Sequence, residues 1–136
     1  MNSKPTEPRL DSDAIRGLRR GVEEFNSGKF FECHDTLEDV WHGIRGPARD
    51  LFQGLIQVAV GFYHLGNGNR IGAASQLEKG LARLSPYGDC YAGMDLATLR
   101  LGVQSWLARV RSGEELHSTV AGLPKLHLKA NEWMME

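Results

Sequence analysis

The least polar stretch of this 136-residue chain, residues 51–65, constrains its fold more than any other segment. Pro47 precedes the stretch and suits the first turn of a helix, where its missing N–H group costs nothing. Read as a helix, the segment from this proline onward is apolar almost all round, so other elements must cover it on several sides. Gln53, Gln57 and His64 interrupt it, and it is too polar as well as too short to span a membrane. We therefore expect this helix at the centre of a bundle.

Four further segments carry apolar residues at spacings of three and four, which is the helical pattern. Turns rich in Gly, Asn and Pro separate these segments. With the central one, the predicted helices cover about residues 12–26, 29–42, 47–65, 70–84 and 96–112. No segment before the tail alternates as a strand does, whereas Leu126 and Leu128 alternate with polar residues and predict an extended tail. The chain then divides into a flexible N-terminal arm (1–10), a helical domain (11–113) and a C-terminal tail packed on that domain (114–136).

A repeat with a spacing of 40 residues relates two predicted helical hairpins. Phe25, Gly28, Cys33, Leu37 and Glu38 align with Leu65, Gly68, Ala73, Leu77 and Glu78. Each copy reads as a helix, a glycine-containing turn and a second helix, which is the unit of tetratricopeptide-like arrays. We predict an all-α fold, a five-helix bundle of two tetratricopeptide-like hairpins with a capping fifth helix and an irregular tail.

Charge and cysteine content argue against several classes of protein. The formal net charge is -1 and no run of Lys or Arg exceeds two residues, so a nucleic-acid partner is not expected. Two cysteines are too few for a disulfide framework, and the polar N-terminus lacks the apolar core of a signal peptide. The expectation is a cytoplasmic protein with no cofactor and no membrane partner.

Polar side chains gather on the second and third predicted helices. His34 and Glu38 stand four residues apart, so they are neighbours on one face of the second helix. On the third helix Gln53, Gln57 and His64 fall within one arc. Polar groups on a buried helix need partners, because each unpaired group costs about 1–3 kcal/mol.

The hairpin turn predicts where those partners lie. With the turn centred near Arg45, residues equally distant from it along the two helices lie at the same level. The resulting pairs are Glu38 with Gln53, His34 with Gln57, and His64 with Asn26. The pattern predicts a polar groove between the second and third helices, with aromatic walls. Its candidate binding residues are His34, Glu38, Trp41, Gln53, Gln57, Tyr63 and His64.

Three roles fit these side chains. A buried polar network can fix the register of packed helices without binding anything. A groove for a ligand or partner is the second role, and a catalytic or metal site is the third, since a His/Glu pair at this spacing can chelate a divalent ion. Against the third role, glutamine is a poor ligand and no third strong ligand lies at that level. Cys33 points into the apolar seam of its helix rather than toward the pair, which leaves no placed nucleophile.

Two motifs carry a resemblance to a known family. The first runs from Phe25 to Trp41 (FNSGKFFECHDTLEDVW), and the second from Phe52 to His64 (FQGLIQVAVGFYH), followed by Gly68-Asn69 and Gly72-Ala73. Together they resemble the family of small prokaryotic and plastid proteins known as domain of unknown function 309. The family usually has Glu-Ala-His-Glu where this chain has Glu-Cys-His-Asp, from position 32 to 35, and both exchanges are mild. The resemblance is strong over about residues 15–84 and loose over the predicted fifth helix. It implies an all-helical single domain and implies no activity.

The sequence leaves two functional classes open. The favoured one is a non-enzymatic binding or interaction module, whose groove receives a small molecule or a peptide. The alternative is a metal-assisted hydrolase that uses His34 and Glu38. No catalytic residue is assigned and no resident metal is expected. A homodimer is left open, because helical hairpins with spare apolar surface often pair.

Overall fold

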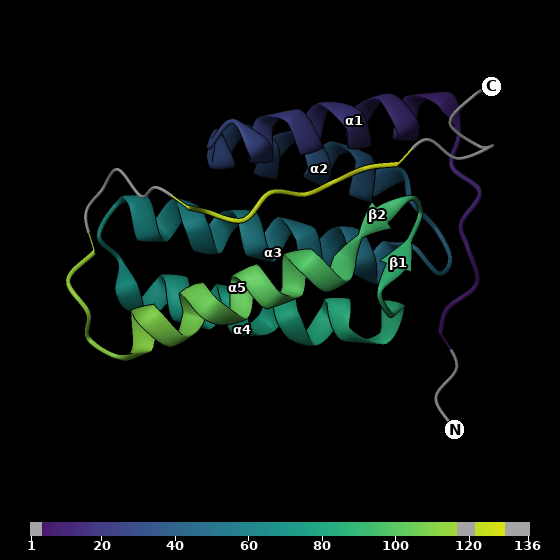
Figure 1. The fold of residues 1–136 in the computed structure, drawn as a ribbon. Helices are drawn as coiled ribbons and strands as arrows, with labels where there is room; N and C mark the ends of the chain where they lie inside the picture. Colours follow the sequence, from purple (N-terminus) through teal and green to yellow (C-terminus); the bar gives the residue numbers. More distant parts are fainter. Residues whose placement is uncertain (1–3, 117–121, 130–136) are drawn as a thin grey trace.

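The computed structural model describes residues 4–116 and 122–129, which form five α helices and one small hairpin (Figure 1). The helices are α1 (Ser12–Asn26), α2 (Phe30–Gly43), α3 (Arg49–Gly66), α4 (Arg70–Leu84) and α5 (Leu96–Arg111). A single 3-10 turn, η1 (Ser85–Tyr87), follows α4 and precedes strands β1 (Cys90–Tyr91) and β2 (Met94–Asp95). The predicted all-α fold is confirmed, whereas tetratricopeptide-like stacking stays a prediction.

Helix α3 lies at the centre, as its apolar sequence predicts. Each helix packs on the next one in the chain, so that α3 is held between α2 and α4. Phe52, Val58 and Ala59 of α3 are fully buried. The helix begins at Arg49 rather than at Pro47, which lies in the preceding turn. No helix within the described ranges has the length and apolar character needed to cross a bilayer.

The two turns of the 40-residue repeat have the same conformation. Gly28 and Gly68 both adopt a φ of 76°, which favours glycine because it has no side chain. Directly after them, the Lys29 and Asn69 backbone N–H groups each donate to a carbonyl five residues earlier, at 2.8 Å. These bonds satisfy carbonyls at the ends of α1 and α3. The repeat is therefore real at the level of turn geometry.

The expectation of no strand before the tail is wrong. Tyr91 pairs with Met94 across a two-residue turn in which Ala92 and Gly93 both have positive φ, at 51° and 75°. Two positive φ values match the twist of a tight hairpin. Strands of two residues are too short to show alternation, which is why the sequence does not reveal them.

Both ends of the described chain lie against this hairpin. In the arm, Tyr91 Oη donates to the Thr6 carbonyl at 2.6 Å, the Ala92 N–H donates to Glu7 at 2.8 Å, and Leu10 is buried. Residues 122–129, named here the strap, run across the bundle beside α1 and α5 (Figure 1). The rest of the predicted tail, 117–121 and 130–136, lies outside the described residues. The domain division and the flexibility of the arm stay predictions.

Candidate functional site

His34 and Glu38 form the polar centre of the outer face of α2. His34 Nε2 lies 2.9 Å from Glu38 Oε2, and His34 Nδ1 lies 3.3 Å from Asp35 Oδ1. The second carboxylate oxygen of Glu38 lies 4.0 Å from His42 Nε2. All four side chains come from one helix, at spacings of one and four, so the helix alone positions them. Glu38 and His42 are more exposed than His34, which is 27% exposed at its side chain.

Aromatic contacts join α2 to α3 at both ends of this face. Near the turn, the Arg49 guanidinium lies 4.0 Å from the centre of the Trp41 ring, and it donates to the Trp41 carbonyl at 3.0 Å. At the far end, the Phe31 and Tyr63 rings are 5.4 Å apart. Trp41 and Arg49 stand equally far from Arg45, whereas Phe31 and Tyr63 differ by four residues in their distance from it, which is about 6 Å along a helix. The outer surface of α2 and α3 between these two contacts is named here the aromatic-ended face. It carries Trp41 and Arg49 at one end, Phe31 and Tyr63 at the other, and His34 and Glu38 at its centre.

The glutamines of α3 do not complete a network with His34 and Glu38. Among the described residues, no hydrogen bond joins His34 to Gln57 or Glu38 to Gln53. Gln57 instead lines a hollow between α3 and α4, together with Asp50 and Arg83. The Oε1 atom of Gln57 is buried there without a hydrogen-bond partner among the described residues. The expected His34–Gln57 contact is therefore not formed. The physical reason is the rotation of α3 about its axis, which turns Gln57 toward the hollow that it lines with Arg83 of α4.

His64 lies apart from the other candidates, as predicted, but its neighbour differs from the predicted one. Its Nδ1 is 3.5 Å from Asn69 Nδ2, in the turn that leads to α4. Asn26 uses its side-chain amide on the strap, accepting from the Leu126 N–H at 2.8 Å and donating to the Leu126 carbonyl at 2.9 Å. His34, Glu38, Trp41 and Tyr63 thus lie at the aromatic-ended face, whereas Gln57 and His64 lie on the α4 side of α3. Gln53 is half-buried on α3.

In the part of the chain that the structure describes, no activated nucleophile stands beside His34. Cys33 is fully buried, and burial, with a smaller contribution from Glu24, raises the pKa of its thiol to about 12. A thiol with so high a pKa carries almost no thiolate at neutral pH. Within the described ranges, moreover, no three His, Cys, Asp or Glu side chains are grouped so as to hold a metal ion.

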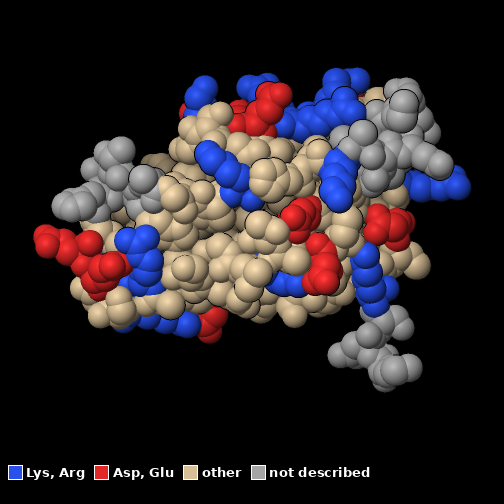
Figure 2. All heavy atoms as spheres, in the orientation of Figure 1, with Lys and Arg blue, Asp and Glu red and all other residues tan. Residues whose placement is uncertain are grey.

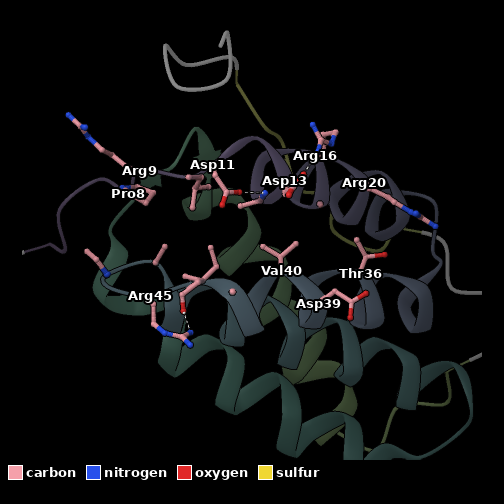
Figure 3. A pocket seen from close by; sticks show the side chains of 17 residues that line it. Pro8, Arg9, Asp11, Asp13, Arg16, Arg20, Thr36, Asp39, Val40 and Arg45 are labelled. Carbon is pink, nitrogen blue, oxygen red and sulfur yellow. Dashed lines mark hydrogen bonds and ion pairs between the residues drawn. The ribbon is translucent and has the colours of Figure 1, made fainter.

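A hollow between α1 and α2 is the feature that sequence reasoning missed. It has a volume of about 860 Å³, and Figure 3 shows Val40 on its inner wall, with Arg9, Arg16 and Arg20 pointing away from it on the α1 side. Two α1 glycines keep the helices close at and beside this hollow, since a Cβ on Gly17 would stand 2.2 Å from Val40 Cγ2 and one on Gly21 would stand 2.5 Å from Leu37 Cδ2. Glycines four residues apart on α1, at 17 and 21, are the signal in the sequence.

Part of the chain, from within α1 to within α4, is similar to a known protein family. Residues 18–76 match the family described as domain of unknown function (DUF309). The DUF309 segment runs from within α1 to within α4 and includes all seven candidate residues, so the resemblance carried by the two motifs is confirmed. An uncharacterized protein of Aquifex aeolicus (strain VF5) is 24% identical over 97 residues, which are 71% of this chain and 29% of that protein. The chain therefore spans less than a third of the length of this relative.

Proposed function

We propose that this chain is a binding module without enzymatic activity, whose partner docks on the aromatic-ended face. The observation that carries the proposal is the exposure of Phe31 and Tyr63, at 49% and 40%, side by side on adjacent helices. The fold gains little from such rings, because much of their surface stays in water. Aromatic side chains of this kind are enriched in the cores of protein interfaces.

The charges beside the rings define the chemistry of the partner. Asp35 and Glu38 place two carboxylates next to His34, and the Phe31 ring centre lies 6.0 Å from that of His34. A hollow lined by Phe30, Phe31 and Tyr63 continues the apolar surface toward the end of α3. We infer that the partner is a peptide segment with an apolar side chain beside a lysine or arginine. The apolar group would cover Phe31 and the cation would meet the carboxylates.

Selection from a displayed peptide library against the full chain tests this proposal. We expect enriched peptides to combine an apolar residue with a neighbouring basic one, and to lose at least tenfold in affinity on Phe31→Ala. Leu101→Ala is the matched control, because Leu101 is 67% exposed on α5, away from this face. Enriched peptides that bind the Phe31→Ala and Tyr63→Ala variants as tightly as the parent would exclude the face as the docking surface.

The metal-assisted hydrolase remains the competing function, and metal content separates the two. Protein purified without an affinity tag is analysed for bound metal, alongside the His34→Ala variant. Near-stoichiometric metal that disappears in the variant would favour the hydrolase and count against a simple binding module. Replacing His34 and Glu38 together with leucine addresses a purely structural role. Unfolding at lower urea concentration with peptide binding unchanged would assign the pair to packing.

A further inference from the structure

Main-chain hydrogen bonds hold the strap along its length, and Lys125 Nζ adds a side-chain bond to the Asn26 carbonyl at 2.6 Å. Besides the two bonds from Asn26 to Leu126, the Gly122 carbonyl accepts from Trp106 Nε1 at 3.1 Å. The His127 carbonyl accepts from the Asp95 N–H at 3.0 Å, and the Lys129 N–H donates to the Gly93 carbonyl at 2.6 Å. These contacts come from the end of α1, the middle of α5 and the β1–β2 hairpin.

From Pro124 onward, the side chains of the strap alternate between the bundle and the solvent, while Leu123 before them is half-buried as well. Leu126 is 3% exposed, and Pro124 and Leu128 are half-buried on the same side. Pro124 sits over Gly102 of α5, where a Cβ would stand 2.7 Å from the proline Cβ. The residues between these anchors, Lys125, His127 and Lys129, are exposed. The surface thus accepts an extended chain with three apolar anchors at alternate positions.

This arrangement is the general mode by which a peptide adds a strand to a sheet edge. Leu128 forms an antiparallel bridge with Met94, so the strap extends the β1–β2 hairpin by a third segment. In this mode main-chain hydrogen bonds supply affinity, and pockets for alternate side chains supply selectivity. Figure 2 shows that Lys and Arg gather along the α1 edge of this side of the molecule, while the area over α5 is largely uncharged.

We propose that the surface beneath the strap is a second binding site, for an extended peptide segment of a partner protein with the pattern Pro-x-Leu-x-Leu. The strap is its resident occupant and competes with that segment. Leu123 of the strap lines the hollow beside Phe31 and Tyr63, but the three anchors and their hydrogen-bond partners lie outside the aromatic-ended face, so different variants test the two proposals. Because the strap is tethered, its local concentration is on the order of millimolar. A partner segment binds when the anchors of the strap are weakened, or when the segment contacts the surface more strongly than the strap does.

Weakening the strap in the full chain should therefore expose the site to a peptide in solution. The probe is a fluorescein-labelled peptide with the sequence of the strap, Gly-Leu-Pro-Lys-Leu-His-Leu-Lys, measured by fluorescence anisotropy. We expect Leu126→Ala to capture this peptide at least tenfold more tightly than the parent chain. Adding Asn26→Ala to that variant should remove this increase in affinity. The incoming peptide then loses both hydrogen bonds between its backbone and the Asn26 side-chain amide.

Controls separate the site from nonspecific binding. Leu101→Ala, an equal truncation of an exposed α5 leucine, should bind the peptide no better than the parent. A peptide with aspartate at its central anchor should not be captured. Leu128→Ala provides a second way to loosen the strap, and far-UV circular dichroism confirms helical content in each variant. If both leucine variants are folded and capture no more peptide than the parent, or if Asn26→Ala leaves the gain intact, the proposal is overturned.

Discussion

Gly61 of α3 lies so close to Leu77 of α4 that a Cβ atom at position 61 would stand 2.7 Å from Leu77 Cδ2. The same atom would lie 3.2 Å from the backbone nitrogen of Leu77. A second close approach comes from the opposite helix, because a Cβ on Gly80 of α4 would stand 2.6 Å from Val58 Cγ2. Glycines on both helices thus set the spacing of this pair. The space that Gly61 leaves is filled by a leucine and is not open to a ligand.

Gly61→Ala should destabilise the fold by about 1–3 kcal/mol, because the added methyl group overpacks the α3–α4 contact. Alanine forms helices better than glycine by about 1 kcal/mol, so the measured loss is the net of two opposing effects. Urea denaturation followed by circular dichroism measures it. Gly66→Ala is the matched control, since its Cβ position meets no atom within 4 Å beyond its chain neighbours and its own helix, and it should leave the midpoint unchanged or higher. A Gly61→Ala variant as stable as the parent would show that the helices can separate without cost.

Stability should fall as the pH rises above 10. Burial raises the pKa of Tyr87 and Tyr91 above 10.0, and that of Tyr91 to about 12, with Tyr87 and Glu7 adding to the effect at Tyr91. Between pH 10 and 12 the unfolded chain loses the Tyr91 proton while the folded chain keeps it. The free energy of unfolding therefore decreases with pH, by at most about 1.4 kcal/mol per unit for this group.

Urea midpoints at pH 8, 10 and 11 test this dependence. The comparison is made in a Cys33→Ala background, because the Cys33 thiol, with a raised pKa, titrates in an overlapping range. In that background, Tyr91→Phe should flatten the decline, since phenylalanine has no proton to lose. Equal declines with and without the Tyr91 hydroxyl would assign the effect to other groups.

The helices could be predicted because their patterns are long. Periodicity of three and four over 14 to 18 residues places α2 and α3 within about two residues of their observed starts. The β1–β2 hairpin could not, because strands of two residues carry no period and the turn depends on a positive φ at Ala92. The course of the strap could not be predicted either, because Asn26 and Leu126 are 100 residues apart in the chain and no local pattern links them.

The sequence predicted how far along their helices the candidate residues lie, but not which neighbouring helix each side chain faces. Trp41 and Arg49 stand equally far from Arg45, and the Arg49 guanidinium does meet the Trp41 ring. The same argument set Gln57 opposite His34, yet Gln57 lies at the hollow shared with Arg83. Level follows from counting residues along two antiparallel helices. Direction depends on how far each helix is rotated about its axis, and the close α3–α4 contact at Gly61 sets that rotation.

The two cysteines should differ sharply in reactivity. Cys33 is fully buried with a thiol pKa raised to about 12, whereas Cys90 is exposed beside the β1–β2 turn. Because the thiolate is the reacting species, the folded chain at pH 8 should give one fast equivalent with Ellman's reagent, from Cys90. Cys33 should react at least about a thousandfold more slowly, and at a normal rate once urea unfolds the chain. Cys90→Ser should abolish the fast equivalent and Cys33→Ala should leave it unchanged. A fast equivalent that persists in Cys90→Ser would mean that the α1–α2 contact over Cys33 opens readily in solution.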